Sequence, residues 1–242
     1  MKKKLITTMA SLLVCSVGYS QENNVVLDYD AVGVGYLHHN IDVEGIELDA
    51  NGVGLGISKR YDNLVVSFGL TWSSVDIERV SNDLLTDVGL DQSEINEVND
   101  SLDLVDIRIL QIGGGIGYVY ELSDSLHLVP SVGIDYEQFE VELFGLSADL
   151  IDSWVVTPSL SLNYAATEKL ELSLGVGYSE PFSTEILGED IDNLKEYGIR
   201  ADGGFAGGLS AEYAINNDVG LGVRAAFAED QTVFGIGLLF HY

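Results

Sequence analysis

Residues 231–242 read QTVFGIGLLFHY and carry the clearest alternating pattern in the chain. Counted back from the last residue, every second side chain is large and apolar: Tyr242, Phe240, Leu238, Ile236 and Phe234. The intervening positions include two glycines and a histidine. Successive side chains of a β-strand point to opposite faces. The stretch therefore predicts a strand with one continuous apolar face and one smaller or more polar face.

The same alternation with period 2 recurs along most of the chain. In residues 64–73, Leu64, Phe68 and Trp72 share one face, while Ser67 and Gly69 lie on the other. Beyond residue 20, no apolar run reaches the roughly 18 residues expected of a transmembrane helix. Ten strands are predicted, with eight as the alternative count, at 28–38, 48–59, 64–77, 104–120, 126–141, 153–165, 169–179, 197–213, 218–228 and 231–242.

The small face of these strands is rich in glycine, which recurs at alternate positions: Gly33/Gly35, Gly52/Gly54/Gly56, Gly113/Gly115/Gly117, Gly175/Gly177, Gly220/Gly222 and Gly235/Gly237. In a soluble sandwich this face would be the solvated surface, where glycine weakens a strand. Glycine fits the restricted inside of a small closed barrel whose large side chains face lipid. The pattern therefore predicts an all-β, antiparallel, up-and-down transmembrane barrel, because hydrocarbon requires every backbone group to be paired. Pro130 and Pro158 fall within predicted strands, which indicates a local bulge or a small register error.

The predicted connections alternate in length. Short turns fall at 60–63, 121–125, 166–168 and 214–217, whereas longer segments fall at 39–47, 78–103, 142–152 and 180–196, with one tight link at 229–230. Short periplasmic turns opposite longer external loops are typical of outer-membrane barrels. A tyrosine closes the strand before each short turn: Tyr61, Tyr120, Tyr164 and Tyr213. These four side chains are predicted to form an aromatic girdle at the periplasmic membrane–water boundary.

The C-terminal strand resembles the assembly signal of bacterial outer-membrane β-barrels, which ends on an aromatic residue preceded by alternating apolar ones. Here the last residue is Tyr242 rather than the more usual phenylalanine. The whole chain beyond residue 20 resembles the small, porin-like members of that superfamily in its architecture. The resemblance implies a location in the cell outer membrane among its lipids and lipopolysaccharide. It also implies insertion by the barrel-assembly machinery, which would recognise Phe234, Ile236, Leu238, Phe240 and Tyr242.

The N-terminus is typical of a secretory signal. Lys2, Lys3 and Lys4 precede a short apolar run at 5–17, and small residues occupy 18 and 20. Cleavage before Gln21 is predicted, which divides the chain into a signal peptide at 1–20 and a single barrel domain at 21–242. A lipoprotein anchor at Cys15, the one cysteine, is the alternative; the bulky Val14 before it argues against this. Either way, no disulfide contributes to the mature fold.

The chain is strongly acidic, with a net charge of −28. Nucleic-acid binding is excluded, because almost nothing is available to neutralise phosphate. Charges predicted to line the lumen are three arginines and five acids: Arg108, Arg200, Arg224, Asp135, Glu137, Glu171, Asp202 and Glu212. They suit either a polar passage for small solutes or an internal network of ion pairs that fills the barrel.

The predicted outer loops are the most acidic part. Residues 78–103 carry eight carboxylates and one arginine, and residues 180–196 carry six carboxylates and one lysine. Such a mouth should concentrate cations. Glu189, Asp190 and Asp192 lack the spacing of a calcium loop, so no metal or other cofactor is predicted. Two adjacent histidines, His38 and His39, lie near a strand end without a catalytic constellation around them, and no enzyme activity is predicted.

The sequence thus favours a narrow passive channel with a cation bias. The alternative is a closed, non-conducting barrel whose acidic external loops act in adhesion or envelope integrity.

Overall fold

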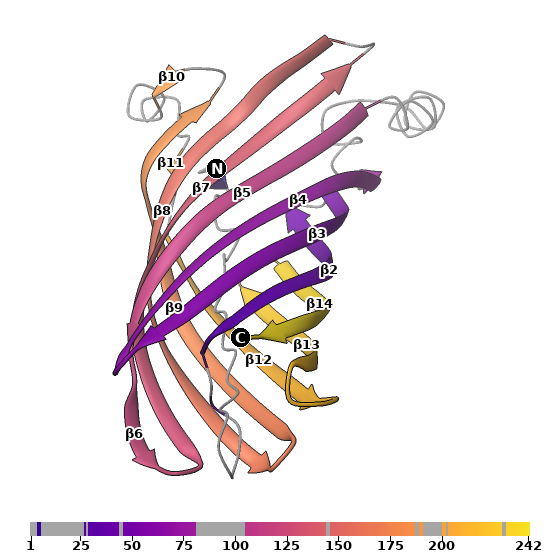
Figure 1. The fold of residues 1–242 in the computed structure, drawn as a ribbon. Helices are drawn as coiled ribbons and strands as arrows, with labels where there is room; N and C mark the ends of the chain where they lie inside the picture. Colours follow the sequence, from indigo (N-terminus) through magenta and orange to yellow (C-terminus); the bar gives the residue numbers. More distant parts are fainter. Residues whose placement is uncertain are drawn as a thin grey trace.

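The computed structural model describes residues 4–5, 27, 29–43, 46–80, 105–143, 146–186, 189–190, 200–201, 203–228 and 231–242. Long, tilted strands wrap round a common axis (Figure 1). Ten of them form the wall: β2 (Ala31–Val43), β3 (Ile46–Tyr61), β4 (Leu64–Val80), β5 (Val105–Tyr118), β7 (Leu126–Leu143), β8 (Leu146–Thr167), β9 (Leu170–Ile186), β12 (Gly204–Ala214), β13 (Val219–Ala228) and β14 (Gln231–His241).

Each wall strand pairs antiparallel with its neighbours in chain order, and the last pairs with the first. β14 runs against β2 from Gln231↔Ile41 to His241↔Ala31, which closes the sheet. The prediction of a closed, up-and-down barrel of ten strands is confirmed. Closure leaves the wall without an edge strand, as a structure surrounded by lipid requires.

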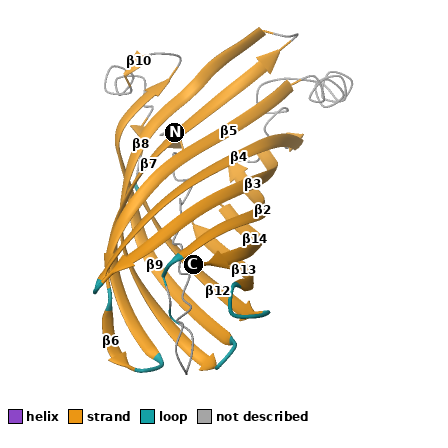
Figure 2. Ribbon diagram, viewed as in Figure 1, coloured by secondary structure: helices purple, strands orange, loops and turns teal. Residues whose placement is uncertain are grey.

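Four short strands complete the described structure. β6 (Tyr120–Ser123) continues β5 beyond Val119 and pairs with β7. β10 (Glu189–Asp190) pairs with the end of β9. β1 (Lys4–Leu5) and β11 (Arg200–Ala201) form a separate parallel pair. Within the described residues the assigned secondary structure consists of strands and turns, with no helix (Figure 2).

The two ends of the barrel differ. One end, here called the turn end, carries the short connections at 62–63, 124–125, 168–169 and 215–218. At the other, the loop end, the strands extend further than the sequence predicted. The expected longer loops at 39–47 and 142–152 are wrong, since Val43 pairs with Ile46 and Leu143 pairs with Leu146. Continued ladder pairing uses backbone groups that a loop would leave to water. The segment 81–104 lies outside the described residues.

Pro130 and Pro158, the two prolines predicted within strands, each coincide with an interruption of one ladder. The β8–β9 pairing passes from Val156 directly to Ser159, skipping Pro158. The pairing of β5 and β6 with β7 likewise stops at Ser131 and resumes at Leu128, skipping Pro130. Proline lacks a donor N–H and is therefore tolerated where the ladder is already broken. The expected local irregularity is present at both positions.

The alternation of side chains follows the wall of the barrel. Large apolar residues are exposed on its outer face, for example Leu55, Phe68 and Leu174 at 52–54% exposure. The neighbouring inward positions hold glycine, serine and threonine, and they are mostly buried or half-buried. An apolar surface this extensive on a monomer marks contact with something other than water. Because this apolar surface is the outer face of a closed barrel, the surrounding medium is lipid hydrocarbon.

Candidate functional site

The inner wall is the candidate functional site, because it is where polar side chains converge. Serine, threonine and amide side chains occupy inward positions of β4, β5, β7, β8 and β9, and several pair with each other. Ser131 Oγ lies 2.7 Å from Ser159 Oγ, and Thr157 Oγ1 lies 3.0 Å from Ser179 Oγ. Two cavities open along this wall. One of about 140 Å³ includes Glu171, Glu212 and Arg224 in its lining, and one of about 70 Å³ includes Asp135.

Acidic side chains outnumber basic ones on the described inner wall above the turn end. Asp135, Glu137, Glu171 and Glu212 alternate with outward apolar residues and are 0–8% exposed. Arg224 on β13 occupies an inward position. The side chains of the predicted lumen residues Arg200 and Asp202 lie outside the described residues.

Arg108 does not belong to the lumen, which corrects the prediction. It shares the outward parity of Ile112 and Ile116 on β5, and its Nη2 lies 2.8 Å from Glu142 Oε2, also outward. Arg108 pairs with Ser74, two residues beyond the exposed Trp72 toward the loop end. At that level the outer face leaves the hydrocarbon, so that an outward charge costs little.

The inward charges lie over glycines of the neighbouring strand. A Cβ built on Gly113 would be 1.7 Å from Asp135 Oδ1, and one on Gly220 would be 2.3 Å from Glu212 Oε1. Arg224 covers Gly235 in the same way, with Nε 2.8 Å from the added Cβ. The glycines thus provide the room in which charged side chains fold against the wall instead of projecting to the barrel axis.

Two carboxylates face each other directly across adjacent strands. Glu171 on β9 is the register partner of Glu212 on β12, and both point inward. Glu171 Oε1 accepts a hydrogen bond from Ser173 Oγ at 3.2 Å. Glu212 Oε1 lies 3.0 Å from His241 Nε2. Like charges directly opposite repel, so a cation between them lowers the energy of the pair.

Toward the loop end the wall combines one polar pair with apolar packing. Gln111 Nε2 donates to Glu137 Oε1 at 2.9 Å, and both side chains are buried. Nearby inward positions form an apolar cluster of Ile41, Ala50, Val75 and Ile109, against which Phe139 packs. The lumen is therefore not uniformly polar along its length.

The turn end contains a group that the sequence analysis missed. Residues 27–30 precede β2, and Tyr29 among them is 2% exposed. Its hydroxyl accepts a hydrogen bond from Asn163 Nδ2 at 3.1 Å and lies 3.2 Å from His127 Nδ1. Burial, more than any other factor, raises the pKa of Tyr29 to about 12, so the phenol is neutral at physiological pH. No sequence pattern marks this contact, because its partners are 98 and 134 residues away.

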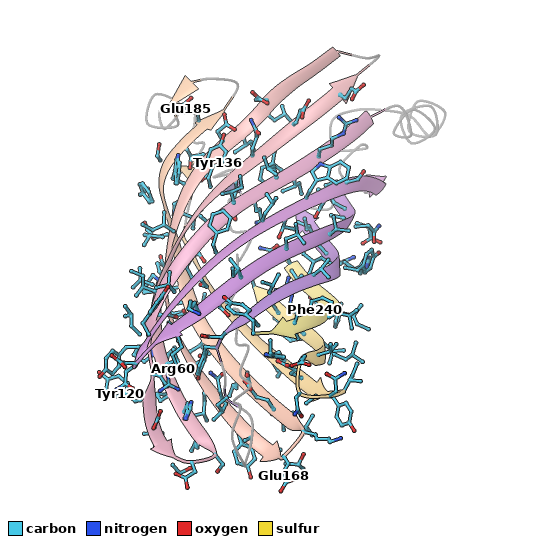
Figure 3. All side chains as sticks on the ribbon, viewed as in Figure 1. Arg60, Tyr120, Tyr136, Glu168, Glu185 and Phe240 are labelled. Carbon is cyan, nitrogen blue, oxygen red and sulfur yellow. The ribbon has the colours of Figure 1, made fainter. Side chains whose placement is uncertain are left out.

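The four predicted girdle tyrosines lie at the turn end. Tyr61, Tyr120, Tyr164 and Tyr213 are each 45–57% exposed on the outer face. Figure 3 shows Tyr120 projecting from the wall close to the turn end. Tyr118 also packs on Tyr120, with ring centroids 4.7 Å apart. The residues proposed as the insertion signal, Phe234, Ile236, Leu238, Phe240 and Tyr242, are also outward and 40–58% exposed.

A second aromatic set, not recognised in the sequence, lies toward the loop end. Tyr136 and Trp154 pack with ring centroids 5.2 Å apart, and Tyr136 donates to Asp152 Oδ1 at 3.0 Å. Tyr36 and Trp72 are exposed on the outer face at a similar register. Aromatic side chains with one apolar and one polar end suit the membrane–water boundary. The two sets therefore bracket an apolar belt.

The beta domain of the Bordetella autotransporter BrkA has a similar structure. It is 9% identical, with a TM-score of 0.53 over 89% of this chain and all of that one. The fold is that of the outer-membrane β-barrels. An outer-membrane channel from Pseudomonas putida F1 is 12% identical, with a TM-score of 0.49 and 92% and 99% coverage. The KdgM porin in complex with oligogalacturonate is 12% identical, with a TM-score of 0.40 and 87% and 99% coverage.

No protein-family model matches the chain, and no curated protein matches it. Among the described residues, no helix is long and apolar enough to cross a membrane. Within the same ranges, no three histidine, cysteine, aspartate or glutamate side chains are arranged to hold a metal ion.

Proposed function

We propose that the protein is a narrow, porin-like channel of the bacterial outer membrane that passes small hydrophilic solutes and prefers cations. The observation that carries the proposal is the inner wall, where Asp135, Glu137, Glu171 and Glu212 face the lumen with Arg224. An apolar outer face, together with inward polar side chains, glycines and two cavities along the wall, supports a channel.

The described wall itself supports the cation preference. At the turn end the charges pair off, since Lys59 lies 3.2 Å from Asp30 and Arg60 hydrogen-bonds Glu121. Between the turn end and the loop end, the described inward positions hold four acidic side chains and one arginine. Charge inside a narrow, low-dielectric wall acts on a passing ion more strongly than charge on an exposed loop. The wall acids would therefore govern selectivity, and the acidic loops would add to it.

One observation favours the alternative of a closed, non-conducting barrel acting through its external loops. Tyr29 reaches the opposite wall at the turn end and hydrogen-bonds Asn163 there. This contact occupies the opening that a permanently open channel would leave clear. The two proposals differ in whether Tyr29 stays in place.

The decisive test is conductance of the refolded chain in a planar bilayer, followed by its reversal potential in a salt gradient. Cation-selective steps support the proposal. Anion selectivity would contradict the role given to the wall acids. Fractionation with the outer membrane tests the location independently. A barrel that reaches that membrane but conducts in no variant would favour the closed alternative.

A further inference from the structure

We infer that Leu27, Tyr29 and Asp30 form a releasable latch that shuts the turn end of the barrel. The inference rests on the proposed channel for its physiological meaning. Its geometry stands independently, on contacts between the segment that precedes β2 and strands on both sides of the lumen.

Tyr29 spans the barrel. Its backbone oxygen accepts a hydrogen bond from Ser58 Oγ on β3 at 2.6 Å, which fixes the residue at the foot of β2 and β3. Its hydroxyl reaches Asn163 on β8 and His127 on β7. In the order round the wall, β8 is the fifth strand from β2. In a closed barrel of ten strands, that is the opposite side.

The side chains of the latch fill the opening. The Tyr29 ring packs with Val65, Val119 and Val129, and it stacks on His127 with centroids 6.1 Å apart and planes 15° apart. The Arg60 guanidinium lies 5.7 Å from the ring centroid. Leu27 packs against Ala165 and is 6% exposed. Aromatic and valine side chains thus meet across the turn end, where solute would pass.

Asp30 holds the latch by contacts at the rim. Its Oδ1 accepts a hydrogen bond from the Arg60 backbone N–H at 2.6 Å, and its Oδ2 lies 3.2 Å from Lys59 Nζ. The backbone N–H of Tyr242 donates to the Asp30 carbonyl oxygen at 3.4 Å. The Lys59 side chain is 43% exposed, and an ion pair in that setting contributes little. The ion pair with Lys59 therefore opposes release only weakly, and the hydrogen bonds to backbone groups provide most of the hold at the rim.

Two features distinguish a latch from a permanent plug. The partners of the Tyr29 hydroxyl are a histidine and an amide, which water can satisfy when the phenol leaves. Directly above the ring lies the 70 Å³ cavity, whose lining includes Ser67, Ser159 and Asp135. The polar side chains of this lining leave space beside the ring that tight packing of a permanent plug would fill. Release of Tyr29 would connect this chamber to solvent at the turn end.

The test uses the mature chain with Ser159→Cys as a probe inside the chamber, because cleavage before Gln21 would leave no other thiol. A membrane-impermeant thiol reagent is added on the turn side of oriented vesicles. Tyr29→Phe removes the hydroxyl and should raise the labelling rate about tenfold. Tyr29→Ala should raise it further. Tyr213→Phe, an equivalent change in an exposed tyrosine at the same end, should leave the rate unchanged.

Conductance provides the second readout. Joining Asp30→Cys to Lys59→Cys with a short bifunctional maleimide should lock the latch and suppress opening, whereas Tyr29→Ala should increase the open fraction. Heat-dependent gel migration confirms that each variant is folded. Equal labelling in all folded variants would overturn the latch. Faster labelling of Ser159→Cys in the Tyr29→Ala variant, without conductance in any variant, would support the latch and contradict the proposed channel. Conductance that is unchanged by both the cross-link and Tyr29→Ala would support the channel and contradict the latch.

Discussion

The carboxylate of Asp135 lies over the backbone of Gly113, its register partner on β5. A Cβ at position 113 would overlap the carboxylate, so the observed position of Asp135 requires glycine there. Replacing Gly113 with alanine should therefore force Asp135 away from the wall.

We expect Gly113→Ala to destabilise the folded barrel by about 1–3 kcal/mol, the usual cost of overpacking. Gly175→Ala is the matched control, since its Cβ would meet nothing closer than 3.9 Å. Thermal unfolding followed by gel migration measures both. The double change Gly113→Ala with Asp135→Ala should recover much of the loss; no recovery would show that the backbone, not the carboxylate, is the obstacle.

Neutralising the facing carboxylates should weaken cation preference. In the Glu171→Gln, Glu212→Gln variant, the reversal potential in a salt gradient should move toward zero, because the pair supplies charge inside the narrow wall. Glu142→Gln removes a carboxylate from the outer face and should leave selectivity unchanged. If both variants behave alike, the external loops rather than the wall set the selectivity.

Arg224→Gln should act in the opposite direction and increase cation preference. It removes the inward arginine of β13 and leaves the wall acids in place. Raising the salt concentration to 1 M shortens the screening length to about 3 Å and should reduce the contribution of exposed loops more than that of the wall. The reversal potential of Arg224→Gln and of the parent, measured at both salt concentrations, separates the two contributions.

Deletion of Tyr242, or Phe240→Asp, should block insertion of the barrel. Phe240 is 44% exposed on the lipid face but pairs with Val219 and Val32 near the turn end, so the charge alone costs only about 1 kcal/mol there. Most of the effect should come from loss of the insertion signal, which is a terminal aromatic residue preceded by alternating apolar side chains. Phe240→Leu keeps an apolar side chain and serves as the control. Folded barrel at parental yield from both altered chains would contradict the proposed signal.

The docked state of Tyr29 should weaken above pH 10. Burial raises its pKa to about 12, with Glu171 and Glu121 acting in the same direction and Asn163 and Arg60 opposing it. A released tyrosine ionises near 10. Below pH 10 both states are neutral and docking is at full strength; between 10 and 12 the released state gains by ionising. Labelling of Ser159→Cys should accelerate over that range in the parent and much less in Tyr29→Phe.

The barrel could be predicted from local sequence patterns. Phe234 to Tyr242 and the alternating glycines define two faces through a local period of 2, and that period depends only on strand geometry. The position of Tyr61, Tyr120, Tyr164 and Tyr213 at the turn end followed in the same way, since each lies beside a turn that the local composition marks; their role as an aromatic girdle stays a prediction. These features need no knowledge of which distant residue lies opposite.

The residues that close and line the lumen could not be predicted in this way, because they are brought together by contacts between distant strands. Tyr29 meets Asn163 across 134 residues of chain, and Asp135 meets Gly113 through a register that no local pattern fixes. Arg108 was misplaced because charge suggested the lumen, whereas its height on the wall allows it to face outward. The face to which a side chain points depends on local strand geometry. Its level along the barrel axis, and the residues that lie opposite it, depend on strand register and on closure of the whole sheet.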